Sequence, residues 1–227
     1  MLWFSDLLKR LLDLVFPDRC AACGGAGGLL CPTCVAQLQP YPLETPTPGL
    51  DGMHIGWIYD QTVRQAIHTL KYRRRRRMAE ALGDALATRL AAPPADALVP
   101  VPLHAGRLAE RGFNQAEELA RRLGQRWGLP ICATGLERGR DTGHQARLNR
   151  AERQTNVAGA FVWCGPNAPP ARVLLVDDVL TTGATLAACA AGLRAAGTRE
   201  VRAVALARSL ARPPSTGYVK MGRHLPG

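Results

Sequence analysis

The sequence predicts an α/β protein in which a parallel sheet is flanked by helices and a small cysteine-rich unit precedes the sheet. Residues 173–176 are a short, continuous apolar run, as in a parallel strand that is buried on both faces. An Ala- and Leu-rich helical pattern follows this run and ends near Gly197. Residues 97–102 form a second apolar run with a helical pattern behind it, and this alternation is typical of parallel sheets.

Length and composition limit the chain to one ordinary domain with an appendage. Of its 227 residues, 47% are hydrophobic and 21% are charged, which is typical of a soluble globular protein. A net charge of +11 favours polyanionic partners, which are a pyrophosphorylated substrate, a nucleic acid or an anionic membrane surface. No apolar run reaches the roughly 18 residues that span a bilayer. The P-loop, HExxH and GxSxG motifs of common hydrolases are absent.

Residues 1–16 predict an amphipathic helix with a wide apolar face, and Pro17 ends it. We expect this helix to pack on its own protein or on a partner, and peripheral attachment to a membrane is the alternative. Lys9, Arg10 and Asp13 interrupt the apolar segment, which argues against a secretory signal.

Four cysteines follow the predicted helix in two C-x2-C pairs: Cys20, Cys23, Cys31 and Cys34. Each pair can present two thiolates to one metal ion, and two pairs complete a tetrahedral shell, so the spacing predicts a structural zinc ribbon within residues 1–38. Disulfides are the alternative, but no export signal supports them. Such a ribbon can bind nucleic acid or protein, or can hold the fold together. The other cysteines are expected to be core thiols: Cys132, Cys164 and Cys189.

Residues 39–50 contain four prolines and predict an extended, semi-rigid linker. The main domain is expected over residues 51–208, beginning with a strand over residues 53–59, a helix over residues 63–70 and a further helix through Leu90. A dense basic run lies between these helices and is either a solvated helical face or a contact for nucleic-acid phosphates. Its members are Lys71, Arg73, Arg74, Arg75, Arg76 and Arg77.

The strand over residues 97–102 is followed by a proline-kinked loop over residues 103–115 and a helix to Trp127. Arg107 and Arg111 in this loop carry guanidinium forks that suit phosphate oxygens. His104 is a candidate base, although an ordinary loop hydrogen bond is the commoner role for such a histidine.

Two segments lack any apolar periodicity. Residues 137–160 form a stretch of this kind inside the domain, and such a stretch is either a functional lid or disordered. Residues 209–227 are basic, carry no acid and contain several prolines and glycines, so we expect a disordered tail.

The turn after residues 173–176 carries the main candidate site: Asp177, Asp178, Thr181, Thr182, Gly183, Ala184 and Thr185. Free backbone N–H groups and the positive end of the helix dipole suit such a turn to a phosphate. The two acids suit sugar hydroxyls, or Mg²⁺ that bridges to a diphosphate. Neighbouring strand residues point to opposite faces, so both acids reach one ligand only if the strand has given way to loop at Asp178.

Residues 173–185, with the sequence Val-Leu-Leu-Val-Asp-Asp-Val-Leu-Thr-Thr-Gly-Ala-Thr, resemble the phosphoribosyl-pyrophosphate (PRPP) motif of type I phosphoribosyltransferases. Three further signatures are similar to the ComF family of competence-associated, GntX-like proteins. They are Leu-Lys-Tyr at residues 70–72, Arg-Gly-Phe-Asn-Gln at residues 111–115, and Gln145, Leu148, Arg153 and Asn156 followed by Phe161. The resemblance covers residues 1–208 and implies a type I phosphoribosyltransferase-like sheet that binds PRPP with Mg²⁺ at residues 177–185.

The resemblance also implies roles for the basic residues. Arg107 and Arg111 would receive pyrophosphate. A flexible lid would close over the diphosphate, and its candidate cations, which we do not rank, are Arg147, Arg150 and Arg153. No acceptor pocket is identifiable, because a zinc ribbon takes the place of the variable hood at the start of the domain.

Three functions therefore stay open. The favoured one is a PRPP-binding protein of natural transformation that handles single-stranded DNA in the cytoplasm, in contact with DNA-uptake proteins or the inner membrane surface. The second is an active phosphoribosyltransferase that transfers ribose 5-phosphate to an unidentified base or amine and releases pyrophosphate. The third is a zinc-containing nucleic-acid binder with a vestigial site.

Overall fold

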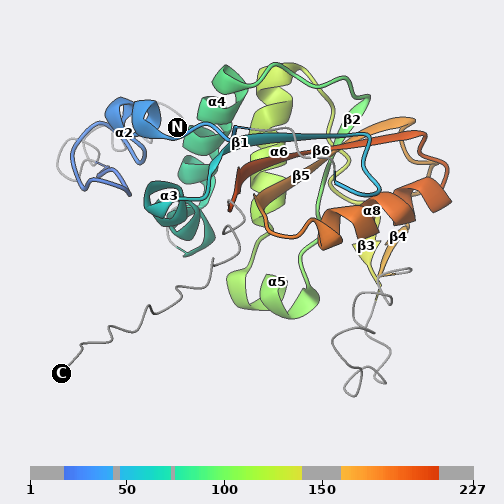
Figure 1. Ribbon diagram of the computed structural model, residues 1–227. Helices are drawn as coiled ribbons and strands as arrows, with labels where there is room; N and C mark the ends of the chain where they lie inside the picture. Colours follow the sequence, from blue (N-terminus) through green and yellow to red (C-terminus); the bar gives the residue numbers. More distant parts are fainter. Residues whose placement is uncertain (1–17, 43–46, 73–74, 140–159, 210–227) are drawn as a thin grey trace, which may run out of the picture.

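The computed structural model describes residues 18–42, 47–72, 75–139 and 160–209, and Figure 1 shows how they are arranged. The helix predicted over residues 1–16 and the tail beyond residue 209 lie outside these described residues. So do the lid arginines Arg147, Arg150 and Arg153. Among the helices that are described, none combines the length and apolar character needed to cross a membrane.

Four parallel strands form the predicted sheet, in the order β1-β6-β5-β2. Their bounds are Gly52–Ile58 for β1, Ala97–Pro100 for β2, Arg172–Leu180 for β5 and Glu200–Arg208 for β6. The two longest strands lie at the centre, where Leu174, Leu175 and Ala203 have no exposed surface. This burial confirms the prediction that the apolar run of β5 is covered on both faces.

Helices cover one face of the sheet, and a helix with a hairpin covers the other (Figure 1). The first layer consists of α3 (Gln61–Tyr72), α4 (Arg75–Arg89) and α6 (Gln115–Trp127), and it packs on Leu98, Leu174 and Val176. The second layer consists of α8 (Ala184–Ala195) with the antiparallel hairpin β3 (Leu136–Arg138) and β4 (Phe161–Trp163), and it packs on Val99, Val173 and Leu175. Successive strand residues thus serve opposite layers, as the period of two requires.

The four-cysteine unit, which includes α2 (Pro32–Gln37), packs directly on the first helical layer. Leu29, Leu30 and Leu38 of this unit belong to the same buried cluster as Leu70 and Met78. Asp18 forms an ion pair of 2.6 Å with Arg77 of α4. The chain then runs extended along β1, where Ile58 N donates to Gln39 O. The cysteine unit and the sheet therefore share one core.

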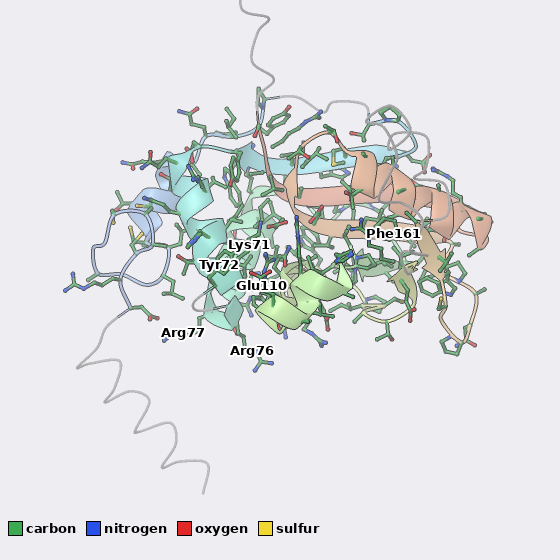
Figure 2. All side chains as sticks on the ribbon, turned by 90° about the horizontal axis from the view of Figure 1, so that it is seen from below. Lys71, Tyr72, Arg76, Arg77, Glu110 and Phe161 are labelled. Atoms are coloured by element: carbon green, nitrogen blue, oxygen red, sulfur yellow. The ribbon has the colours of Figure 1, made fainter. Side chains whose placement is uncertain are left out.

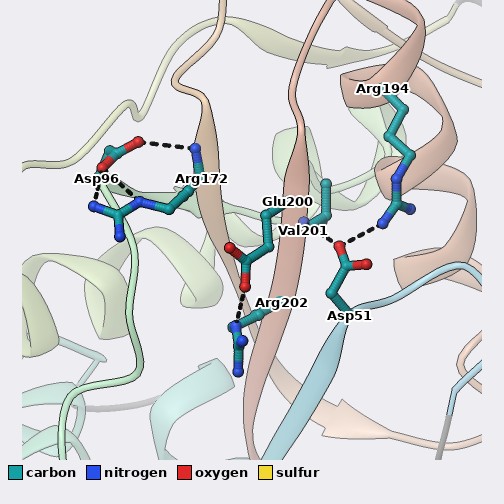
Figure 3. Close-up of polar contacts among 7 residues, drawn as sticks. All are labelled: Asp51, Asp96, Arg172, Arg194, Glu200, Val201 and Arg202. Carbon is teal, nitrogen blue, oxygen red and sulfur yellow. Dashed lines mark hydrogen bonds and ion pairs between the residues drawn. The ribbon is translucent and has the colours of Figure 1, made fainter.

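Acid–arginine contacts join the strands at the amino-terminal edge of the sheet (Figure 3). Asp96 accepts a hydrogen bond of 2.9 Å from the Arg172 backbone and pairs with the Arg172 guanidinium at 2.6 Å. Asp51 accepts from Val201 N at 2.7 Å and pairs with Arg194 of α8 at 2.5 Å. These polar groups stabilise the starts of the strands, so they serve the fold at this edge.

Two features differ from the sequence prediction. The loop expected over residues 103–115 contains a short helix, α5 (Ala105–Arg111), which starts after His104 accepts the Gly106 N–H and ends at Gly112 with φ of 75°. No residue of α5 is buried, so the sequence carries no apolar period there. The hairpin of β3 and β4 was also missed, because each strand has only three residues and shows no alternation.

Candidate functional site

The candidate site lies at the carboxyl edge of the sheet, where β5 leads into α8. Val101 N donates to Val176 O at 2.9 Å, so the ends of β2 and β5 lie side by side. The segment after β2, which carries α5, therefore starts beside Val176, the residue before Asp177. The last turn of α3 reaches the same edge, because Lys71 contacts Asp178. Ligands of open α/β sheets bind at this edge.

The turn of residues 181–183 keeps its backbone amides available. Within the described part of the chain, no group accepts a hydrogen bond from the amides of Thr181, Thr182 or Gly183. Ala184 N has a long contact of 3.4 Å to Thr182 Oγ1, and Ala187 N donates to Gly183 O as α8 begins. Because these amides lie at the positive end of α8, the turn can bind an anion.

Gly183 is required in this turn for two reasons. Its φ of 83° lies in the left-handed region, which glycine adopts without steric cost. A Cβ at this position would also lie 2.7 Å from Thr47 Cγ2. Thr47, which is only 7% exposed, therefore lies directly against the turn. Sequence patterns do not predict this contact, because the two residues are far apart in the chain.

The two acids lie on a strand and not in a loop. β5 continues through Asp177 and Asp178 to Leu180, and its residues still pair with β6 at Asp177↔Ala205 and Val179↔Ala207. The expectation of a loop at Asp178 is therefore wrong. The physical reason is that β6 is also nine residues long, so the ladder of hydrogen bonds extends past the acids. The two acids nevertheless lie close together, because the Asp178 amide donates to Asp177 Oδ1 at 2.8 Å and the charge of Asp178 raises the pKa of Asp177, so one ligand can still contact both.

Lys71 neutralises Asp178. Its Nζ lies 2.6 Å from Asp178 Oδ2, and the side chains are 25% and 7% exposed. Asp178 Oδ2 accepts no directed hydrogen bond from the described chain, so the ion pair alone compensates its burial. The sequence predicts Lys71 as part of the basic run that contacts nucleic acid. Its ammonium group lies instead among the acids of the PRPP-like motif.

Asp177 is closely enclosed although part of its surface is exposed. Burial raises the pKa of Asp177 well above its usual value, the charge of Asp178 raises this pKa further, and the charge of Lys71 opposes both effects. The Asp178 amide donates to Asp177 Oδ1 at 2.8 Å. Carboxyl oxygens accept hydrogen bonds from sugar hydroxyls and coordinate divalent cations, so the acid pair suits either ligand.

The segment after β2 presents arginines from α5. Arg107 is exposed, whereas Arg111 is partly buried and donates to Gln115 Oε1. Asn114 caps α6 by accepting from Ala116 N at 3.0 Å, and its Nδ2 donates to Val101 O at 3.0 Å. Asn114 and Gln115 belong to the Arg-Gly-Phe-Asn-Gln signature, but the signature predicts no role for either residue. Their contacts tie α5 and α6 to the end of β2.

His104 has the ordinary role that we expected for a loop histidine. Its ring nitrogen Nδ1 accepts a hydrogen bond of 3.2 Å from Gly106 N and so caps α5. Its candidacy as a base gains no support from this position, since the observed contact is a helix cap.

The arginine run serves the fold in part. Arg77 pairs with Asp18 of the cysteine unit, and Arg76 is exposed (Figure 2). Arg73 and Arg74 lie outside the described residues, as does the side chain of Arg75. Lys71 and Arg77 form ion pairs. Among the predicted nucleic-acid contacts whose side chains are described, Arg76 is the one that is exposed and has no ion pair within the described residues.

The four cysteines fit a zinc ion. Their Sγ atoms lie within 4.8 Å of one another, and Cys23 and Cys31 are 3.8 Å apart. Tetrahedral Zn–S bonds of about 2.3 Å place sulfur atoms about 3.8 Å apart. Burial acts against ionisation of Cys20, but hydrogen bonds from the backbone, chiefly of Cys31, outweigh it and lower the pKa to about 6. Three glycines at positive φ form the tight turns of the unit: Gly24, Gly27 and Gly28.

Comparison with known protein families matches both parts of the chain. The family model described as "Phosphoribosyl transferase domain" matches residues 108–224, and the model described as "Double zinc ribbon domain" matches residues 11–47. The second match, together with the cysteine cluster, supports a structural zinc ion.

Curated relatives carry names that refer to competence and DNA use. Competence protein F of Haemophilus influenzae is 37% identical over 50% of this chain and 51% of the relative, so the match spans about half of that protein. DNA utilization protein YhgH of Salmonella typhi is 32% identical over 67% of this chain and 70% of the relative. Competence protein ComFC of Streptococcus pneumoniae is 34% identical over 48% and 47%.

A solved structure of glutamine PRPP amidotransferase from B. subtilis, complexed with ADP and GMP, aligns with 56% of this chain and 25% of that chain. The identity is 25% and the TM-score is 0.40.

Proposed function

Because the chain belongs to the ComF family of competence-associated proteins, and joins a zinc ribbon to a phosphoribosyltransferase domain, we propose that it binds PRPP at residues 177–185 and acts in DNA uptake. The observation that carries this proposal is the turn between β5 and α8, where the amides of Thr181, Thr182 and Gly183 have no acceptor in the described chain. A buried turn with satisfied amides would leave no room for an anion.

Each part of the site has a role in holding PRPP. The 5-phosphate lies over residues 181–185, where backbone N–H groups and threonine hydroxyls donate to its oxygens. Asp177 and Asp178 accept hydrogen bonds from the ribose hydroxyls, which are the neutral donors nearest to a 5-phosphate. The enclosed position of both acids keeps water from competing for these bonds.

The diphosphate of PRPP extends toward α5. Arg107 and Arg111 are the cations there, and guanidinium groups donate pairs of hydrogen bonds to phosphate oxygens. Oxygen ligands are those that Mg²⁺ prefers, and the acid pair offers them; when bound, the ion neutralises charge on the diphosphate.

The physiological role that we propose is the handling of single-stranded DNA in the cytoplasm, where DNA-uptake proteins or the inner membrane surface are neighbours. The support is the net charge of +11 together with the exposed Arg76 of α4. Contacts of this kind bind phosphate without reading sequence, so affinity for DNA should fall steeply with salt.

Transfer of ribose 5-phosphate to a base or amine is the second candidate function. The enclosed acid pair favours it, because acids that hold the ribose hydroxyls keep the sugar in place while the bond to pyrophosphate breaks. Bound cations would stabilise the leaving group by electrostatics.

Calorimetric titration with PRPP and Mg²⁺ tests the proposal. The wild type is compared with Asp177→Asn plus Asp178→Asn, and with Asp96→Asn as a matched control at the opposite edge of the same sheet. We expect binding by the wild type and the control but loss of binding by the double variant. No heat of binding from the wild type, or equal affinity of all three proteins, contradicts the proposal.

Two further measurements separate the functions. Release of pyrophosphate from PRPP across a panel of bases and amines identifies a transferase, and silence across the panel with intact PRPP binding leaves a binding protein. A zinc-containing nucleic-acid binder with a vestigial site instead binds DNA equally well in the wild type and the double variant and has no affinity for PRPP.

A further inference from the structure

Tyr72 lies exposed on the rim of the candidate site. It ends α3, whose apolar residues Val63, Ile67 and Leu70 are all buried, yet the Tyr72 side chain is 60% exposed. Figure 2 shows Tyr72 and Lys71 close to Glu110 of α5, where α3 approaches that helix. Among the large hydrophobic side chains that are exposed in the described residues, Tyr72 has the largest exposed fraction, since Leu108 and Val162 are each 43% exposed.

A cation from another element lies over this ring. The Arg111 Cζ atom is 5.5 Å from the centre of the Tyr72 ring, and the His68 ring packs beside it with centroids 4.8 Å apart. Aromatic rings and guanidinium groups both stack on flat heterocycles. A surface site that has one of each, with the Tyr72 side chain still 60% exposed, is therefore suited to a nucleobase.

The contact of Tyr72 with a cation suits a nucleotide. Arg111 lies over the ring, and Arg107 of the same helix is exposed, although the acid Glu110 of α5 is also close to Tyr72 (Figure 2). A phosphate that accompanies a base would therefore find a guanidinium group at the ring, whereas an apolar partner would have to desolvate it.

Tyr72 is also connected through its neighbour Lys71 to the candidate PRPP site of residues 177–185, which we call the cradle. Lys71, the residue before Tyr72, is held by Asp178 at 2.6 Å. Tyr72 directly follows Lys71 in the last turn of α3, so both residues belong to the end of the helix that reaches the carboxyl edge of the sheet.

We propose that Tyr72, with Arg111 over its ring, is a nucleobase-binding site on the rim of the cradle. The part of this inference that concerns an acceptor base rests on the proposed PRPP function, whereas stacking itself does not. The ligand is a planar nitrogen heterocycle, which either belongs to a single-stranded nucleic acid or is a free base or nucleoside. A purely structural role, in which Tyr72 only holds α5 in place, is the competing explanation.

Binding of labelled oligonucleotides to the zinc-loaded full chain tests this site. The probes are an oligothymidylate of about 12 nucleotides and an abasic oligonucleotide of equal length. The variants are Tyr72→Ala, Tyr72→Phe and, as a matched control, Val162→Ala, which shortens another exposed apolar side chain next to Phe161 on the far side of the domain (Figure 2). Titrations with thymidine and adenosine form the second arm, for a free base or nucleoside.

If the base belongs to a nucleic acid, Tyr72→Ala weakens oligothymidylate binding by about 5- to 150-fold, the range expected for loss of one stacked base. Tyr72→Phe keeps the affinity within about twofold, because the ring face remains. Val162→Ala leaves it unchanged, and the abasic probe binds the wild type and Tyr72→Ala equally. If the ligand is a free base or nucleoside, Tyr72→Ala weakens binding of thymidine and adenosine, whereas Tyr72→Phe and Val162→Ala do not.

Three outcomes overturn the inference. They are a loss in Tyr72→Ala no larger than in Val162→Ala, equal wild-type affinity for the thymidylate and abasic probes without nucleoside binding, and no binding of any probe. PRPP titration of Tyr72→Ala separates the two proposals. Unchanged PRPP affinity leaves the cradle intact whatever happens to base binding, whereas weakened PRPP affinity with unchanged base binding identifies the structural role.

Discussion

The ion pair between Lys71 and Asp178 can be tested by removing only its positive charge. Lys71→Met keeps the apolar stem of the side chain and leaves Asp178, which is 7% exposed, with no cation at 2.6 Å. The same change removes the charge that favours ionisation of Asp177. The structure therefore predicts that this variant folds less stably, because two enclosed carboxyl groups then face each other without compensation.

The size of the effect follows from burial. Removal of one partner of a buried ion pair costs about 3–5 kcal/mol. Lys71 is 25% exposed, so water can replace part of the lost interaction. We therefore expect the free energy of unfolding to fall by about 2–3 kcal/mol at neutral pH.

The loss should depend on pH in a defined direction. Burial and Asp178 raise the pKa of Asp177 above 3.8, and removal of Lys71 raises it further. A carboxyl group whose pKa is higher in the folded state destabilises the fold above that pKa, and this cost is relieved as pH falls through it, because the folded state takes up the proton first. The deficit of Lys71→Met should therefore be largest at neutral pH and should shrink as the pH falls toward 3.8.

Urea unfolding followed by circular dichroism at about pH 7.5 and about pH 5 measures both effects. Lys71→Arg is the matched control, since it keeps the charge, and the double variant Lys71→Met plus Asp178→Asn should recover at least half of the loss because no unpaired charge stays buried. A loss below about 0.5 kcal/mol at neutral pH, or a deficit that grows on acidification, refutes the reasoning.

Three further predictions follow from close contacts and from the cysteine cluster. Gly183→Ala should lower the free energy of unfolding by about 1–3 kcal/mol in chemical denaturation, through its φ of 83° and its contact with Thr47. Thr47→Ser, which removes the clashing methyl group, should restore part of this, and no restoration would contradict the contact. Gly192→Ala should lower the melting temperature, because its Cβ would lie 2.3 Å from Phe161 O; a variant as stable as the wild type would exclude that approach. Chelation should release zinc in a colorimetric assay and lower the melting temperature of the whole domain in calorimetry, because Leu29 and Leu30 of the cysteine unit belong to the core of the domain. An unchanged thermal transition would show that the cysteine unit does not stabilise the domain.

Local patterns were sufficient for most of the fold. The strands expected over residues 53–59, 97–102 and 173–176 correspond to β1, β2 and β5, and the helices flanking them are present. These elements carry their own signals, because apolar residues repeat with the period of the element and glycines end the helices. The helix α5 carries no such signal, since it buries nothing, and the acids lie on a strand because β6 extends the pairing of β5.

The contacts of the site depended on packing. Thr47 against Gly183, Lys71 on Asp178 and Arg111 over Tyr72 each join residues from separate elements. A sequence shows which charges and rings exist but not which of them meet, because that depends on strand order and on the way helices cover the sheet.

The sequence by itself therefore determined the chemistry that is encoded within a few neighbouring residues. It contains the two cysteine pairs, whose spacing suits one metal ion, and the acid–threonine–glycine turn, whose backbone suits a phosphate. Only the tertiary structure decided that Lys71 serves the acid pair and that Tyr72 stays open at its rim. The physical reason is that chelation and capping are satisfied within a turn, whereas the charge opposite a buried carboxylate is set by the packing of elements distant in the chain.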